Sequence, residues 1–251
     1  MYPPETPPTC DSCIREPRRQ SRYAPSAYSR LNLCDECIKA DIRCYSCQVR
    51  AAFSDGRLLR GTVKVDDRDY RCSYCASPSL VESQDAADKV LYSTRNWLDK
   101  WFARHGEEEK ILAKLSISVT LVDAATLATG DGEKGTILGR AIWTRGSTDF
   151  QIKIIRKLRV VPFLETLAHE LTHVWAYRTG NDGKEAIEGF CNYVAYMALG
   201  TVHGKLADDA RRREAYMLKE VDIRYGGDFK AIRLGCRSET ANPVTFFKKM
   251  A

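Results

Sequence analysis

The feature that most constrains this chain is the pentapeptide His169-Glu170-Leu171-Thr172-His173. On a helix, residues four apart lie on one face with Cβ atoms about 5–6 Å apart, so both imidazoles can reach one metal ion. Glu170 lies beside them, where a carboxylate can take a proton from water on that ion. Two of the chain's four histidines stand at this spacing. We therefore predict a metal site, in preference to a buried helix whose histidines only form hydrogen bonds.

The residues around this motif predict a helix. Pro162 suits a first helical turn, and Gly180 gives a stop signal. The apolar residues between them form a broad stripe: Leu164, Leu167, Ala168, Leu171, Val174 and Trp175. The motif therefore falls within a helix that has one apolar side.

A zinc hydrolase needs a third protein ligand and an open fourth position. A second helix is predicted over 184–199, and it carries Glu185 and Glu188 one turn apart. We prefer Glu188 because Asn192, four residues later on the same face, can bond the outer nitrogen of a ligating histidine and orient it. Glu185 has only Gly189 at the equivalent position and falls near the helix start, where negative charge is favoured.

Whether cysteines form disulfides or bind metal depends on the cellular compartment of the protein. No run of 18 apolar residues occurs, and residues 1–5 lack the charged and apolar pattern of a signal peptide. We therefore expect a cytoplasmic protein, with the nucleus as the alternative and no membrane association. In a reducing compartment, the ten cysteines of this chain are expected to bind metal rather than form disulfides.

Eight cysteines form four Cys-x-x-Cys pairs ahead of the histidine motif. Each pair presents two thiolates to one zinc ion, and two pairs complete a closed tetrahedron. Pairing in sequence assigns the first four to one structural zinc and the last four to another: Cys10, Cys13, Cys34 and Cys37, then Cys44, Cys47, Cys72 and Cys75. An interleaved arrangement of the same pairs is the alternative. We favour pairing in sequence because the interval within each predicted site, 14–33 and 48–71, can hold a short hairpin. A strand is predicted at Arg60–Val65 in the second interval.

The net charge of +6 does not favour nucleic-acid binding. Residues 1–80 hold 13 Lys and Arg against 10 Asp and Glu, and residues 81–251 hold 26 against 23, so each part carries +3. Eight thiolates and two Zn²⁺ add −8 and +4 to the first part, which then carries −1. The basic character of the cysteine-rich part disappears once its metals are counted.

Three segments are predicted along the chain. Residues 1–9 contain four prolines and predict a disordered tail. The zinc-binding module covers 10–79, and an α+β domain covers 80–251. Within this domain the pattern predicts the following helices and strands: a helix at 83–105, strands at 115–122, 139–144 and 151–155, the two helices described above, and a polar helix at 208–224. Cys191 and Cys236, outside the pairs, are expected to be core thiols.

The order of these motifs resembles that of a known family. His-Glu-x-x-His followed on a second helix by Glu-x-x-x-Asn is similar to the gluzincin metallopeptidases. More narrowly, three stretches look like the plant DA-one peptidases: Leu167–Trp175, Glu188–Cys191 and Tyr225–Lys230. The third stretch has Asp228 and Lys230 where those enzymes have Gly and Arg. The cysteine pairs resemble a LIM domain, with a linker of six residues between its halves and Cys34 where that family usually has His.

The resemblance implies a small gluzincin-type metallopeptidase domain preceded by a LIM-like double-zinc module. It implies a zinc-dependent endopeptidase that cleaves protein substrates, with one catalytic and two structural Zn²⁺, and a ubiquitin-related regulator. Glu170 would be the general base, and the hydroxyl of Tyr225 would donate to the developing oxyanion, with a packing tyrosine as the alternative. The strand at 151–155 would be the edge strand that binds the substrate. The alternative function is a non-catalytic zinc-binding adaptor.

Overall fold

The computed structural model of the chain describes residues 24–25, 32–33, 44, 62–65, 70–71, 80–127, 138–219, 227–236 and 241–250. Their helices and strands make a mixed α+β protein, as predicted. The chain divides into two compact units, Met1–Leu80 and Val81–Ala251. In the described ranges, no helix combines the length and the apolar character needed to cross a membrane.

Short antiparallel strand pairs lie in the intervals between the cysteine pairs of the first unit. β1 (Ala24–Pro25) pairs with β2 (Asn32–Leu33), and β3 (Val63–Lys64) pairs with β4 (Tyr70–Arg71). β3 lies within the strand predicted at Arg60–Val65, which is therefore confirmed over two residues. The two long intervals, 14–33 and 48–71, thus each contain the strand pairing that a hairpin requires.

The predicted structural zinc sites of this unit lie mostly outside the described residues. Of their eight cysteines, the structure describes Cys44, which is buried and forms a β-bridge with Tyr70. The other seven lie outside the described residues: Cys10, Cys13, Cys34, Cys37, Cys47, Cys72 and Cys75. Both four-cysteine sites therefore stay predictions.

The second unit contains a three-stranded sheet in the order β6-β8-β7. β6 (Ser116–Val122) runs parallel to β8 (Asp149–Ile155), and β7 (Gly139–Trp143) runs antiparallel to it. All three strands were predicted, but the expectation that 151–155 forms the substrate-binding edge is wrong. β8 has a hydrogen-bonded neighbour on both sides, and its apolar side chains Phe150 and Ile152 are buried. Among the strands that the structure describes, β7 is the edge of the sheet on the antiparallel side.

The long helices begin and end close to their predicted positions. In α2 (Gln84–Arg104), Ser83 is the N-cap and accepts a hydrogen bond from the Ala86 N–H, which satisfies a donor that the helix leaves unpaired. α4 (Val160–Arg178) contains the histidine motif, and α5 (Ile187–Leu199) follows it. The remaining helical segments are α3 (Ala124–Leu127), η1 (Gly204–Leu206), α6 (Ala207–Lys219), α7 (Asp228–Gly235) and α8 (Pro243–Lys249).

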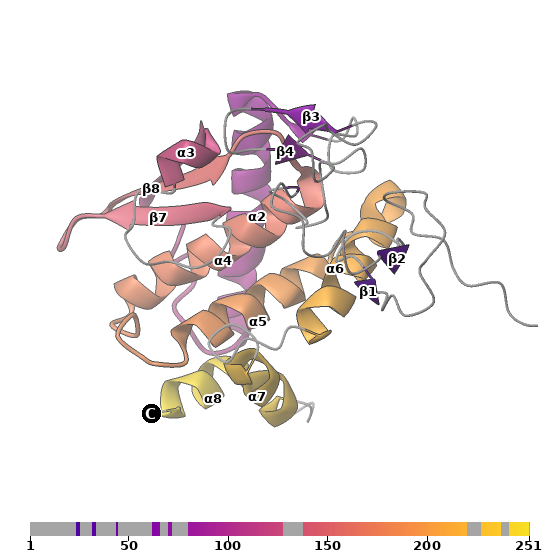
Figure 1. Ribbon diagram of the computed structural model, residues 1–251. Helices are drawn as coiled ribbons and strands as arrows, with labels where there is room; N and C mark the ends of the chain where they lie inside the picture. The colour runs from indigo at the N-terminus through magenta and orange to yellow at the C-terminus, as the bar shows by residue number, and fades with distance from the viewer. Residues whose placement is uncertain are drawn as a thin grey trace, which may run out of the picture. The chain divides into compact units, whose positions relative to one another are not determined.

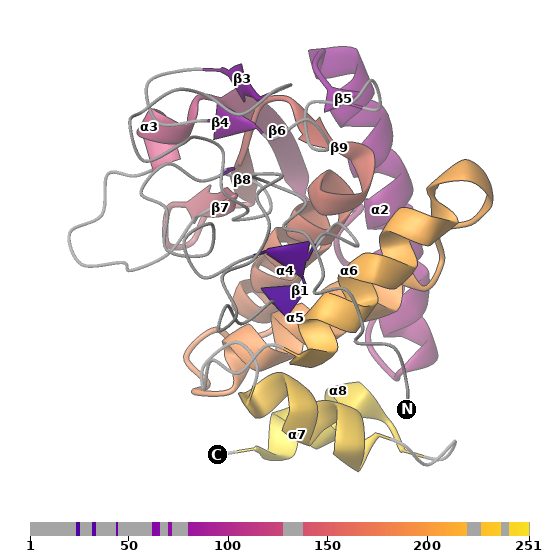
Figure 2. The same ribbon diagram turned by 45° about the vertical axis from the view of Figure 1, so that its right-hand side comes forward.

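α4 is the central element of this unit. It packs against β7 and β8 on one side and against α5 on the other, while α2 contacts both α4 and β6 (Figures 1 and 2). Phe102 of α2 stacks on Trp175 of α4 with ring centroids 4.5 Å apart. Both rings are fully buried, so the helix that carries the histidines is held by core packing along its length.

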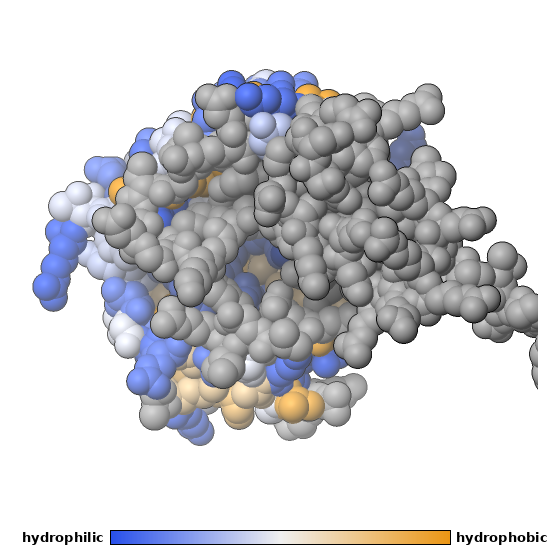
Figure 3. All heavy atoms as spheres, in the orientation of Figure 1, coloured by the Kyte–Doolittle hydropathy of each residue, from blue (hydrophilic) through white to orange (hydrophobic). Residues whose placement is uncertain are grey.

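The turn between β7 and β8 also anchors the sheet to α4. This turn is hydrophilic and projects at the left of Figure 3. Gly146 adopts a φ of +83°, which favours glycine, and its N–H donates to the Tyr177 hydroxyl of α4 at 2.7 Å. The Tyr177 ring lies 5.2 Å from that of Trp143 on β7. These contacts set the position of β7 along α4.

Two ion pairs of low exposure connect α6 to α4 and its N-cap. Arg213 pairs with Glu165 of α4, and Asp209 pairs with Arg159, the N-cap residue. By contrast, Arg211 pairs with Asp208 on an exposed surface of α6. Of the arginines of this helix, Arg213 therefore contributes to packing and Arg211 lies on a solvated face.

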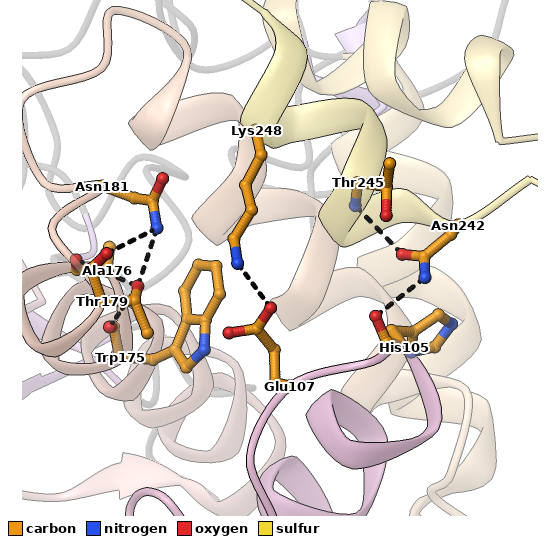
Figure 4. Close-up of polar contacts among 9 residues, drawn as sticks. All are labelled: His105, Glu107, Trp175, Ala176, Thr179, Asn181, Asn242, Thr245 and Lys248. Carbon is orange, nitrogen blue, oxygen red and sulfur yellow. Dashed lines mark hydrogen bonds and ion pairs between the residues drawn. The ribbon is translucent and has the colours of Figure 1, made fainter.

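The C-terminal helix closes the core beside Trp175 (Figure 4). The side-chain amide of Asn242 donates to the His105 carbonyl at 2.8 Å, which ties the start of α8 to the end of α2. Lys248 Nζ lies 2.6 Å from Glu107 Oε1 and 5.9 Å from the centre of the Trp175 ring. His105 is the C-cap residue of α2, at the end of the helix predicted over 83–105.

Candidate metal centre

The two motif histidines meet on the face of α4 that turns toward α5. Their Nε2 atoms lie 3.1 Å apart. Two unprotonated nitrogens at this distance repel each other unless a proton or a metal cation is shared between them. The pair therefore forms one site, as the four-residue spacing predicted.

Glu188 of α5 reaches both histidines. Its Oε2 lies 3.3 Å from His169 Nε2, and its Oε1 lies 3.5 Å from His173 Nε2. Ligands at about 2.0–2.1 Å from a tetrahedral zinc ion lie about 3.3 Å from each other, so these separations fit one ion. The side chains of His169, His173 and Glu188 are 17%, 18% and 33% exposed, so each of the three is partly accessible to solvent. Glu185, the other candidate, is exposed.

Asn192 sets the orientation of His169. The Nδ1–H of His169 donates to Asn192 Oδ1 at 2.9 Å. With the proton on Nδ1, the lone pair of the neutral imidazole is on Nε2, the atom that faces His173 and Glu188. The structure thus brings Asn192 to the position that the sequence predicted for it.

The charges at the centre favour a cation. Burial lowers the pKa of His169, but its hydrogen bond to Glu188 and the charges of Glu170 and Glu188 outweigh this effect and raise the pKa above the ordinary 6.5. Burial raises the pKa of Glu188, but its hydrogen bonds and charge interactions with His169 and His173 outweigh this effect and hold the pKa well below the ordinary 4.5. A metal ion bound between the histidines and Glu188 would balance the charge of this carboxylate in the same way as protons on the histidines. A divalent cation therefore suits these three side chains.

Glu170 lies beside the histidines and contacts the edge of the sheet. It is 8% exposed, and its Oε2 accepts a hydrogen bond from the Ala141 N–H of β7 at 2.7 Å. The hydrogen-bond pattern between β7 and β8 explains this contact. The Ile155 N–H donates to the Leu138 carbonyl, and hydrogen-bonded pairs alternate along an antiparallel ladder. With Ala141 opposite Ile152, the Ala141 N–H and carbonyl point away from β8, toward the free edge.

Gly139 permits this close approach of β7 to α4. A Cβ at this position would lie 2.5 Å from Thr166 Cγ2 and 3.4 Å from Glu170 Cγ. Any larger residue would therefore push the strand away from the helix. Gly139 and Ala141 have no functional signature in the sequence, because only their contacts with α4 connect them to the site.

Cys191 is a further member of the centre that the sequence analysis treated only as a core thiol. It is fully buried, as expected, yet its Sγ and one ring nitrogen of each of His169 and His173 all lie within 4.8 Å of one another. Burial, followed by the charges of Glu188 and Glu170, raises the pKa of its thiol well above the ordinary 9.0. Cys236, the second unpaired cysteine, is partly exposed at the end of α7, so its assignment to the core is wrong.

Two other predicted features lie near the site in sequence. Tyr225 lies outside the described residues, so its role stays a prediction. Gly189, which follows Glu188, allows α7 to contact α5: a Cβ there would lie 2.3 Å from Asp228 Cβ and 2.7 Å from the Phe229 nitrogen. The glycine of this motif is therefore required by helix packing.

Comparison with known proteins finds no family model, curated sequence or solved structure that matches this chain. Function is therefore inferred from the geometry and chemistry of the site.

Proposed function

We propose that the second unit is a zinc-dependent peptidase of gluzincin type. The observation that carries this proposal is the convergence of His169, His173 and Glu188, with separations of 3.1 to 3.5 Å, beside a carboxylate at a sheet edge. These three residues would hold Zn²⁺ as ligands. Bound zinc lowers the pKa of a water molecule to about 7 and polarises a carbonyl group.

The residues of the chain have separate tasks in peptide hydrolysis. Asn192 keeps the His169 proton on Nδ1, so that Nε2 is free to act as a ligand. Glu170 accepts the proton of the attacking water and delivers it to the amine that leaves. The hydrogen bond from Ala141 holds this carboxylate at the edge of the sheet before substrate binds.

The substrate would bind as an extended peptide along β7. This strand ends the described sheet, and an edge strand can accept a further chain by backbone hydrogen bonds. The carbonyl of Ala141 points toward that free edge, next to Glu170, so a peptide paired there would bring its scissile bond to the general base. The side chain of Ile142 is exposed on β7, which favours a substrate with an apolar residue near that position.

The first unit would select partners or substrates. We propose that it is a LIM-like module with two zinc ions, each bound by four of the cysteines at 10–75. A closed four-thiolate site has no vacant position for chemistry. The strand pairs β1–β2 and β3–β4, one in each of the two long intervals, support the pairing of these cysteines in sequence. A ubiquitin-related regulator is implied by the resemblance alone.

Replacing the general base tests the enzymatic proposal against the adaptor alternative. Glu170→Gln keeps the three zinc ligands and the side-chain size, so zinc content by mass spectrometry and folding by circular dichroism should match the wild type. Cleavage of a proteome-derived peptide library should slow by about 10²–10⁴-fold, because the proton acceptor is lost. Glu185→Gln is the matched control, since Glu185 is exposed, and should cleave at the wild-type rate.

Two results would contradict the peptidase proposal. One is a Glu170→Gln protein that cleaves as fast as the wild type. The other is a zinc-loaded wild-type chain that leaves the whole library intact, which would favour the adaptor.

A further inference from the structure

Cys191 lies on the same face of α5 as the residues that form the metal centre. Glu188, Cys191 and Asn192 stand at i, i+3 and i+4, which places them side by side on a helix. The first contacts both histidines and the last orients His169. The thiol between them is fully buried and forms no disulfide.

The position of Sγ suits a metal ligand. Glu188 meets the two imidazoles with different oxygens, whereas Cys191 brings one atom within 4.8 Å of a nitrogen of each. In a tetrahedral zinc site with Zn–S near 2.3 Å and Zn–N near 2.0–2.1 Å, sulfur and nitrogen lie about 3.5 Å apart. The limit of 4.8 Å exceeds this separation by about 1.3 Å, so a shift of at most that size would bring the thiol into the coordination sphere.

We propose that Cys191 is a fourth protein ligand for the ion held by His169, His173 and Glu188, and that it alternates there with a water molecule. When Cys191 binds, the S–H bond breaks, its proton passes to solvent and an Sγ–metal bond forms, with no change of oxidation state. Four protein ligands close the tetrahedron, as in structural zinc sites, and a water molecule in place of sulfur leaves it open. The thiolate would also favour soft ions such as Zn²⁺ and Cd²⁺ over Mg²⁺ or Ca²⁺.

The inference rests on the proposed function for the presence of an ion at this site, and it does not require catalysis. Cadmium NMR of the full-length chain tests it, because each sulfur ligand moves the cadmium resonance downfield. The resonance of this site is the one that disappears in His173→Gln. It should lie between the positions of sulfur-free and four-thiolate sites, and Cys191→Ser should move it upfield into the sulfur-free region.

Two further variants make the result decisive. Cys236→Ser is the matched control and should leave the resonance in place, since Cys236 lies at the end of α7. Cys191→Ala, which adds no buried hydroxyl, should give the same upfield position as Cys191→Ser if the fold is retained by circular dichroism.

A wild-type resonance in the sulfur-free region that neither Cys191 variant moves would reject the thiol ligand. If Glu170→Gln still abolished cleavage in that case, the peptidase proposal would stand and the inference would fail. A wild-type chain with no cadmium resonance that depends on His173 would overturn both.

Discussion

Removing the amide of Asn192 tests how much the orientation of His169 contributes to metal binding. In Asn192→Ala the Nδ1–H of His169 loses an acceptor at 2.9 Å. An unsatisfied buried donor costs about 1–3 kcal/mol. This cost falls mainly on the zinc-bound state, because a metal-free imidazole can move its proton to Nε2 whereas a zinc ligand cannot. The lower part of the range applies because the His169 side chain is 17% exposed. At 1.4 kcal/mol per factor of ten, about 1.4–2 kcal/mol corresponds to zinc binding about 10- to 30-fold weaker. This falls within the 10- to 100-fold range typical of groups that support a metal ligand.

Competition with a chromophoric chelator measures this change. The relevant binding step in the full-length chain is the one that His173→Gln removes. Asn192→Asp should restore zinc affinity to at least the wild-type value, because a carboxylate accepts the same N–H bond and does so more strongly. Asn181→Ala, which removes a buried amide bonded to Thr179, controls for loss of stability alone and should leave zinc affinity unchanged. Unaltered zinc affinity in a folded Asn192→Ala protein would refute the orienting role.

Two predictions concern stability. Because the pKa of His169 is raised in the folded chain, protonated His169 stabilises the metal-free fold below about pH 6.5, and this contribution is lost as pH rises through the folded pKa. Because the pKa of Glu188 is lowered, ionised Glu188 stabilises the metal-free fold above about pH 4.5. The melting temperature of the metal-free chain should therefore be highest near pH 5–6 and fall toward pH 8. Saturating zinc should reverse this trend, because zinc binds unprotonated histidines. A metal-free melting temperature that rises steadily to pH 8 would contradict this. Gly189→Ala should lower the free energy of unfolding by about 1–3 kcal/mol in urea titrations, because the new Cβ would lie 2.3 Å from Asp228 Cβ. Gly183→Ala, with nothing within 4 Å, should stay within about 0.5 kcal/mol of the wild type, and equal stability of the two variants would show that α7 yields without cost.

The sequence by itself determined the parts of the site that depend on local geometry. The spacing of His169 and His173 places both on one face of any helix, and the apolar stripe around them predicts that helix. The same reasoning distinguished Glu188 from Glu185, because Asn192 stands one turn beyond the former. These relations hold within a single helix, so no knowledge of its partners was required.

Only the tertiary structure decided which elements surround that helix. The residue pattern of a strand indicates which side chains are buried. It did not reveal that β8 has partners on both sides while β7 lies at the edge of the sheet in the described part of the chain. Strand order follows from pairing between segments that are distant in sequence, as in the parallel pair of β6 and β8. The expectation of an edge strand at 151–155 was wrong for this reason.

The contacts of Ala141, Gly139 and Cys191 were hidden from the sequence for a related reason. A backbone N–H has no signature in the sequence, so the hydrogen bond from Ala141 to Glu170 depends on the phase of the β7–β8 ladder and on the approach of α4. That approach in turn depends on the missing Cβ of Gly139. Cys191 has the apolar, buried character of a core residue, and only the packing of α5 against α4 places its sulfur beside two imidazoles. The chemistry of this centre is thus set by helix periodicity within α4 and α5, and its surroundings are set by contacts that only the folded chain creates.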